Sequence, residues 1–298
     1  MGRPMSTGTR NQTYREVDVP GGLHVGIWEP DDEPAGTIVA IHGVTSSHKA
    51  FPAVARALPE FRIVAPDLRG RGRSNALGGP YGMARHADDV AHALAHLGIT
   101  RALPVGHSMG AFVAVVLAHR HPSLMDRLVL VDGGMPLELP EGAAPDEAIA
   151  AILGPAAQRL SKTFASVEEY RDLWRAHPAF ADFTQDVVDY VDYDLDGEAP
   201  QLRPATRYEA LEQDTIDLGR DDGALMDAID ALAVPAKFLQ AERGMLDQPT
   251  GLFSDGYLAR WVARVPLLEA EKVMGINHYT IVFDAAGVDA IVRAVRED

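Results

Sequence analysis

The sequence contains no cysteine. This absence excludes disulfide bonds, thiolate metal sites and a cysteine nucleophile, and it leaves the redox compartment undecided. Long apolar runs are also missing, because no stretch approaches the roughly 20 residues that a membrane-spanning helix needs. The polar stretch from Met1 to Asn11 lacks the apolar segment of a signal peptide. We therefore expect a cytoplasmic protein without membrane insertion.

Basic residues are scarce, with 27 Lys and Arg against 43 Asp and Glu and a formal net charge of −16. This balance argues against nucleic acid and anionic membranes as partners, and mildly against strongly anionic substrates. Hydrophobic residues make up 47% of the 298 positions, which is ordinary for a globular protein with a full core. The length fits one large domain, or a domain with one sizeable insertion.

The most informative stretch is Leu103–Ala111, which reads LPVGHSMGA. A short apolar strand leads into Gly-x-Ser-x-Gly, and small residues then open a helix, as in a nucleophile elbow. A strand that turns abruptly into a helix strains the middle residue, Ser108. Gly106 and Gly110 remove side chains that would collide at this turn. We therefore expect the Ser108 hydroxyl to stand out as a nucleophile at the carboxyl end of a sheet.

Apolar runs typical of strands buried on both faces alternate with helical patterns along the chain. The runs predict strands at residues 37–41, 62–65, 103–106, 128–131, 236–240 and 267–270. The helical patterns lie at residues 51–58, 83–97, 108–120, 257–264 and 281–295. This alternation indicates an α/β fold whose mostly parallel, twisted sheet is covered by helices on both faces. Before it, we expect an irregular lead-in over residues 1–12 and an antiparallel hairpin of residues 14–19 and 23–28.

The alternation stops at residues 135–232, where the pattern is helical, acidic and interrupted. We predict a core of residues 1–134 and 233–298 and an inserted helical lid of residues 135–232. The lid would cover the carboxyl edge of the sheet, where open α/β sheets bind ligands. Most of its aromatic residues should pack the lid and some should face the ligand: Phe164, Tyr170, Trp174, Phe180, Phe183, Tyr190, Tyr193 and Tyr208.

Four stretches together carry a family resemblance: His42-Gly43, Asp67–Ser74, Gly106–Gly110 and Gly275–His278. The chain resembles the α/β-hydrolase superfamily, in its single-lid branch of esterases, lactonases, C–C bond hydrolases and cofactor-free perhydrolases. The resemblance covers residues 36–134 and 236–295 and fades in the lid. It implies the α/β-hydrolase fold, no cofactor, and a nucleophile, an acid and a histidine in that chain order.

A serine hydroxyl becomes a good nucleophile only when a base accepts its proton. We expect this base to be His278, which follows the last strand after a short loop and precedes an apolar helix. An oxyanion hole needs two donors aimed at the developing charge. The expected donors are the backbone NH groups of Met109, at the start of the elbow helix, and of Val44, after His42-Gly43.

The acid that would orient His278 is left open. In most of the family it follows the strand that resumes after the lid, in a Gly-x-x-Asp pattern, and here Gly244 falls at its position. We favour Asp132, at the end of the strand at 128–131, a position that some relatives use. Asp247 and Glu242 remain alternatives. The acid would accept the imidazole NH and hold the correct tautomer.

Two patterns resemble metal sites but are incomplete. His92 and His96 have the i,i+4 spacing of zinc ligands without the Glu of His-Glu-x-x-His. Asp192–Gly197 opens like a calcium loop, yet its twelfth position is Arg203 and not Glu. We therefore predict no metal. The resemblance further implies that three arginines tie loops together instead of binding phosphate: Arg69, Arg71 and Arg73.

Together these observations predict a serine hydrolase that cleaves a carboxylic ester, lactone or similarly activated carbonyl of a small, mostly apolar molecule through an acyl-enzyme. C–C bond hydrolysis and perhydrolysis are the alternatives among enzymes. An alternative from another class is a ligand-binding homologue with low turnover. The expected partner is a small-molecule substrate, and the sequence leaves the oligomeric state open.

Overall fold

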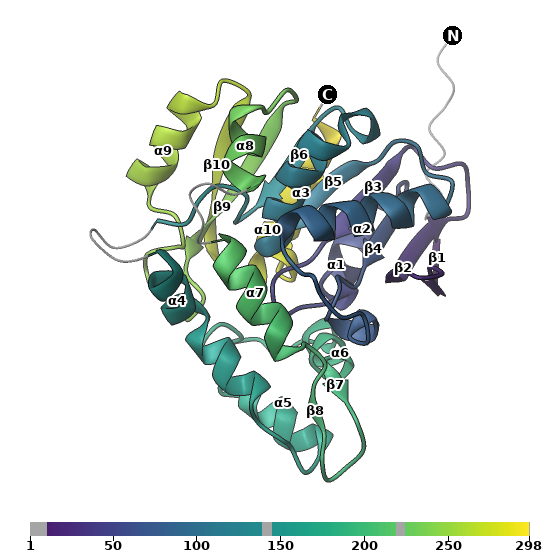
Figure 1. Cartoon of the computed structure of the whole chain (residues 1–298), viewed down its shortest axis with the longest axis vertical. Coiled ribbons are helices and arrows are strands. Elements are labelled where there is room, and N and C mark those ends of the chain that lie inside the picture. Colours follow the sequence, from purple (N-terminus) through teal and green to yellow (C-terminus); the bar gives the residue numbers. More distant parts are fainter. Residues whose placement is uncertain (1–10, 139–144, 219–223, 298) are drawn as a thin grey trace.

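The computed structural model of the protein describes residues 11–138, 145–218 and 224–297 (Figure 1). Its centre is an eight-stranded sheet in the order β1-β2-β4-β3-β5-β6-β9-β10. The strands span Gln12–Asp18 (β1), His24–Pro30 (β2), Thr37–Ile41 (β3), Arg62–Pro66 (β4), Leu103–His107 (β5), Leu128–Val131 (β6), Ala236–Arg243 (β9) and Leu268–Asn277 (β10). From β4 to β10 neighbouring strands are parallel, whereas β1 and β2 pair antiparallel at one edge.

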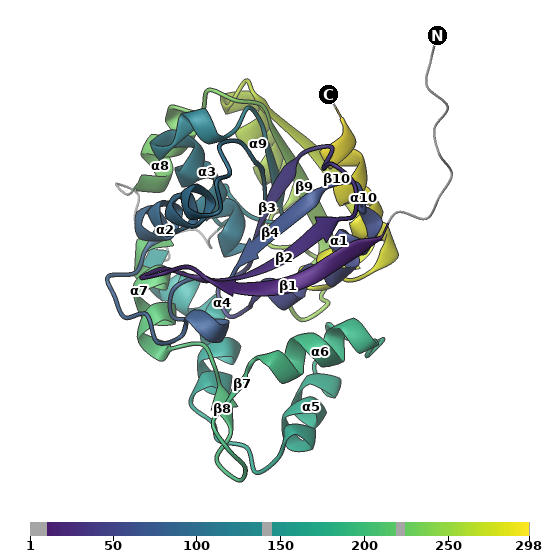
Figure 2. The ribbon, with the colours of Figure 1, turned by 90° about the vertical axis from the view of Figure 1, so that its right-hand side faces the viewer.

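Helices cover both faces of the sheet (Figure 2). They span Pro52–Ala57 (α1), Met83–His96 (α2), Met109–Arg120 (α3), Asp255–Arg264 (α9) and Ala285–Arg296 (α10). Side chains of a strand point alternately to its two faces. Accordingly, Leu128 and Leu130 join the apolar cluster under α2, α3 and α9, while Val129 and Val131 join the cluster under α1 and α10. All four residues are buried, which explains their uninterrupted apolar run.

Several further elements lie between β6 and β9. They are α4 (Pro145–Leu160), α5 (Val167–Arg175), α6 (Gln185–Tyr193), the short strands β7 (Leu195–Asp196) and β8 (Arg203–Pro204), α7 (Tyr208–Leu218) and α8 (Ala224–Asp230). Helices α5 and α6 lie together below the sheet in Figure 2. In contrast, α8 packs on α3, and its Leu225, Ala228 and Ile229 belong to the apolar cluster on that face of the sheet. The division into a core and a lid at residues 135–232 stays a prediction.

The fold class predicted from the sequence is confirmed, and the deviations are at element boundaries. The last strand extends to Asn277 instead of residue 270, because β10 is an edge strand whose exposed polar residues hide its length from an apolar count. The last helix begins at Ala285, after a separate 3₁₀ turn at Thr280–Val282. The lead-in predicted for residues 1–12 was wrong at its end, since β1 begins at Gln12, and residues 1–10 lie outside the described residues. Among the described residues, no helix combines the length and the apolar character needed to cross a membrane.

Phe238 on β9 tests the packing of the core. Its ring is fully buried and meets Phe253 edge to face, with centroids 5.1 Å apart. Replacing it with alanine removes this apolar contact and leaves a cavity, so we expect Phe238→Ala to lower the free energy of unfolding by about 3–5 kcal/mol. Urea denaturation monitored by circular dichroism would measure the loss. Met274→Ala, at a side chain that is 61% exposed, should change stability by less than about 0.5 kcal/mol. Equal effects of the two substitutions would contradict the packing described here.

Candidate active site

Ser108 occupies a strained turn between β5 and α3. Its backbone has φ 54° and ψ −124°, a left-handed conformation that is rare for residues other than glycine. The two glycines of the motif are sterically required. A Cβ on Gly106 would lie 2.3 Å from the carbonyl oxygen of Gly110, and a Cβ on Gly110 would lie 1.9 Å from that of Ile41. This crowding explains why the chain has glycine at both positions.

His278 lies between Ser108 and Asp132. Its Nε2 is 3.0 Å from the Ser108 Oγ, and its Nδ1 is 2.7 Å from the Asp132 Oδ2. The imidazole and the carboxylate are almost completely buried, at 3% and 1% exposure. With Nδ1–H donating to Asp132, Nε2 is left as an acceptor for the serine hydroxyl. The three side chains come from the ends of β5, β6 and β10, which meet at one edge of the sheet.

The two alternative acids are bound elsewhere. Asp247 accepts hydrogen bonds from Arg243 Nε (2.8 Å) and Asn277 Nδ2 (3.1 Å). Glu242 Oε2 accepts from the backbone NH of Gly275 at 2.7 Å. Asp132, in contrast, is bound to the neighbouring strand β9, where its Oδ1 accepts a hydrogen bond from the backbone NH of Ala241 at 3.0 Å. Of the three carboxylates suggested by the sequence, the structure brings only Asp132 to His278.

The two expected oxyanion donors lie beside the serine. Val44 and Met109 line the same cavity as Ser108. Among the described residues, neither backbone NH group has a protein acceptor. The loop of Val44 passes close to the elbow, since a Cβ on Gly43 would lie 3.2 Å from the Ser108 Cβ. Met109 is the first residue of α3, whose exposed NH groups and dipole favour negative charge at this end.

A buried ion pair fixes the Val44 loop. Arg71 is fully buried, its Nε donates to the Val44 carbonyl oxygen at 2.9 Å, and its Nη2 lies 2.5 Å from Asp214 Oδ2 on α7. Burial alone would raise the pKa of Asp214, but the charges of Arg71 and His86 hold it down to about 2. Arg71 therefore has the structural role that the resemblance implied. Its partner Asp214 carried no signal in the sequence, because the contact joins segments far apart in the chain.

Two neutral histidines support the loops of Gly43 and His278 on either side of Ser108. The Nδ1–H of His42 donates to the Gly43 carbonyl oxygen (2.7 Å) and its Nε2 accepts from the Leu68 NH (2.8 Å). Burial lowers the pKa of His42 to about 4. Burial and the neighbouring His278 lower the pKa of His107 to about 3, and its Nε2–H donates to the His278 carbonyl oxygen at 2.8 Å. This support of the His278 loop by His107 carried no signal in the sequence, because the two residues are far apart in the chain.

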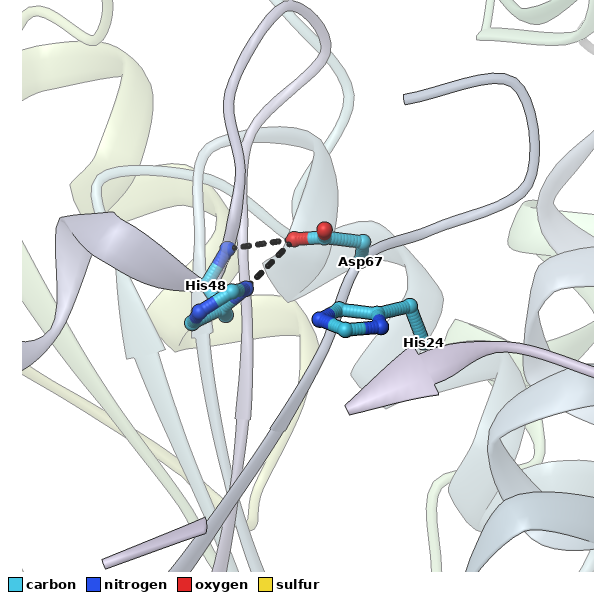
Figure 3. A group of neighbouring side chains, drawn as sticks. All are labelled: His24, His48 and Asp67. Atoms are coloured by element: carbon cyan, nitrogen blue, oxygen red, sulfur yellow. Dashed lines mark hydrogen bonds and ion pairs between the residues drawn. The ribbon is translucent and has the colours of Figure 1, made fainter. Parts of the chain in front are cut away.

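A cluster of His24, His48 and Asp67 could in principle attract a metal, since one possible ligand atom of each lies within 4.8 Å of the others (Figure 3). The imidazole of His48 is, however, already engaged on both sides, by Asp67 Oδ1 at 2.9 Å and by the Tyr14 hydroxyl at 2.7 Å. Asp67 also accepts from the Tyr193 hydroxyl at the end of α6, at 2.8 Å. We interpret the cluster as a hydrogen-bonded tie between α6 and the sheet edge. The absence of a metal stays a prediction.

The two other metal-like patterns noted in the sequence differ in their surroundings. His92 and His96 are both exposed on α2. In the acidic segment, Asp192 is paired with Arg171 Nε at 2.8 Å, and Asp194 is buried against Arg159. These pairings leave the calcium-like segment tied to arginines of α4 and α5.

The cavity beside Ser108 is narrow, about 60 Å³, and mostly apolar. Phe112, Leu137, Leu153, Met245 and Phe283 contribute to its walls. Of the aromatic residues predicted to pack the lid or face a ligand, Tyr190 lines this cavity. Others pack within the protein, including Phe164, Tyr170 and Phe180. Tyr208 is 51% exposed and does neither. The candidate site therefore combines the polar side chains of Ser108, His278 and Asp132 with an apolar pocket.

Comparisons with known proteins agree with this architecture. A sequence profile of the family described as alpha/beta hydrolase fold matches residues 36–251. Lipase LipV of Mycobacterium tuberculosis is 36% identical over 131 residues, covering 44% of this chain and 48% of that protein. The putative carbamate hydrolase RutD of a Caulobacter species is 39% identical over 134 residues, covering 43% and 45%. The alignments thus span less than half the length of these curated relatives.

Solved structures extend the likeness to nearly the whole chain. The crystal structure of E-2-(acetamidomethylene)succinate hydrolase superposes with a TM-score of 0.78, covers 96% of this chain and 100% of that one, and is 24% identical. A thioesterase domain from the curacin biosynthetic pathway superposes with a TM-score of 0.69, covers 94% and 98%, and is 21% identical. At these identities the comparison shows a shared fold.

The neutral state of His42 makes a prediction about acid stability. Unfolded, its pKa is 6.5, and folded it is about 4, so the unfolded chain binds the extra proton between these values. The contribution of neutral His42 to the free energy of unfolding is fully present above pH 6.5. As the pH falls to about 4, this contribution decreases by roughly 3 kcal/mol. We expect the gap in free energy of unfolding between wild type and His42→Asn to shrink by this amount from pH 7 to pH 4. Urea titrations at both pH values would measure it, and a constant gap would contradict the assignment.

Proposed function

Because the chain belongs to the alpha/beta hydrolase fold family, we propose that it is a serine hydrolase acting on a carboxylic ester, lactone or similarly activated carbonyl of a small molecule. The observation that carries this proposal is the position of His278, within hydrogen-bond distance of both Ser108 Oγ and Asp132 Oδ2. The relatives named as a lipase and as a putative carbamate hydrolase are consistent with carbonyl substrates.

In this proposal Ser108 is the nucleophile and His278 the general base. The imidazole accepts the hydroxyl proton as Oγ attacks the carbonyl carbon, and Asp132 stabilises the imidazolium that forms. The oxygen of the tetrahedral intermediate would accept hydrogen bonds from the NH groups of Val44 and Met109. His278 then donates its proton to the leaving group, which departs and leaves an acyl-enzyme.

Water completes the cycle by the same steps. His278 accepts a proton from water, the resulting nucleophile attacks the acyl carbonyl, and Ser108 leaves with the proton returned to its Oγ. Apart from the substrate and water, these steps use only side-chain and backbone groups of the chain. The apolar walls around Ser108 favour an apolar acyl or alcohol portion next to the scissile bond.

Substitutions of the three carboxylates test the assignment of the acid. On p-nitrophenyl esters of acetate to octanoate, we expect Asp132→Asn to lower kcat by about 10⁴-fold, because the wrong imidazole tautomer is then stabilised. Asp247→Asn and Glu242→Gln serve as matched controls, since both carboxylates are bound to other partners, and should stay within about threefold of wild type. Loss of activity in Asp247→Asn with full activity in Asp132→Asn would overturn the assignment.

Ser108→Ala tests the nucleophile in the same assay. It should abolish turnover of every ester and also prevent covalent labelling by a fluorophosphonate probe, because both reactions need the serine Oγ. Mass spectrometry of the intact protein would detect the label. Equal labelling of wild type and Ser108→Ala would contradict the proposal. A wild-type protein that accepts neither the esters nor the probe would instead favour a ligand-binding role.

A further inference from the structure

A second cavity of about 450 Å³ adjoins the catalytic one. It lies among residues of α4, the end of α5 and the loop after β9. Four residues contribute to the walls of both cavities: Ala156, Met245, Leu252 and Tyr279. The second cavity therefore lies next to the pocket around Ser108, and neither Ser108 nor His278 contributes to its walls.

The second cavity has an unusual charge for this protein. Its walls include Arg159 and Lys162, and none of the described residues that line it is acidic. The chain as a whole carries 43 acidic against 27 basic residues. A basic cavity in an acidic protein points to an anionic ligand. The mostly negative surface repels anions, whereas the positive side chains of the cavity attract them. The net charge had argued mildly against anionic substrates, and this cavity is a local exception.

Arg159 is positioned before any ligand arrives. Its side chain is 6% exposed, and Nη1 donates to the Tyr170 hydroxyl and to Asp194 Oδ2, both at 2.5 Å. Its guanidinium also stacks over the ring of Trp174 at 4.9 Å. Among the described residues no acceptor is found for Nε or Nη2, and the buried Nε1 of Trp174 likewise has none. Asp194 offsets the charge of Arg159, so Lys162 gives the cavity its net positive charge.

We propose that the second cavity binds a carboxylate carried by the substrate at the end remote from the scissile carbonyl. The Nε–Nη2 edge of a guanidinium matches the two oxygens of a carboxylate, and a buried, preorganised arginine loses little entropy on binding. Lys162, exposed at the rim, adds attraction without a fixed geometry. This inference rests on the proposed hydrolase activity and specifies its substrate class as esters that bear a carboxylate.

Matched pairs of charged and neutral esters test the inference. The mono-p-nitrophenyl esters of glutaric to suberic acid carry the carboxylate on the acyl side, and their neutral counterparts are p-nitrophenyl alkanoates of equal length. On the alcohol side, 4-carboxyphenyl butyrate is compared with 4-carbamoylphenyl butyrate. We expect wild type to show a higher kcat/KM, by about tenfold or more, for the charged member of at least one pair.

Charge variants then locate the preference. Lys162→Glu should remove most of the preference for the charged ester, measured as the ratio of kcat/KM for the charged and the neutral member of a pair. Arg159→Lys keeps a positive charge beside Asp194 but loses the planar edge of the guanidinium. This variant should also reduce the preference for the charged ester, by about tenfold. Arg260→Glu is the matched control, because Arg260 is exposed on α9, a helix that contributes no residue to the cavity, and it changes the net charge equally.

The outcomes separate the two proposals. Hydrolysis of neutral esters without a charge preference, or a preference that Lys162→Glu and Arg260→Glu change equally, would overturn the carboxylate site and leave the hydrolase intact. Absence of hydrolysis of all esters would overturn the proposed function itself. If Arg159→Lys unfolds, as thermal denaturation would show, Lys162→Glu alone decides the question.

Discussion

The arrangement depends on one imidazole that is hydrogen bonded on both sides. His278 meets Ser108 and Asp132 because parallel strands place their carboxyl ends at the same edge of the sheet. Each of the three side chains follows a different strand, so the geometry is set by strand pairing and not by local sequence. The strained backbone at Ser108, and the positive φ of 48° at Asp132, are tolerated because the packed core fixes both strands.

Buried polar contacts also hold the loop of Val44, one of the two proposed oxyanion donors. Arg71 bonds the Val44 carbonyl oxygen and pairs with Asp214 on α7, while His42 bridges Gly43 and Leu68. Removing one partner of such a buried pair leaves an uncompensated charge, which is strongly destabilising. The position of Val44, one of the two proposed oxyanion donors, therefore depends on α7, a helix that lies between β6 and β9. Arg71 thus links α7 to the loop that passes next to Ser108.

The sequence contained the parts of this site that are local. The elbow around Ser108 and the apolar runs of the buried strands could be recognised because neighbouring residues determine them. The choice among Asp132, Asp247 and Glu242 could only be ranked, because it depends on which loops meet in space. The Asp214 partner of Arg71 and the basic cavity at Arg159 were missed for the same reason. Their residues are far apart in the chain and follow no motif.

The most direct test of the central claim is a crystal structure of the protein after reaction with a small organophosphonate. The reagent's phosphorus would mimic the tetrahedral intermediate of acyl transfer. We predict phosphorus bonded to Ser108 Oγ, with the phosphoryl oxygen about 3 Å from the NH groups of both Val44 and Met109. An adduct on another residue, or a phosphoryl oxygen directed away from those two NH groups, would contradict it.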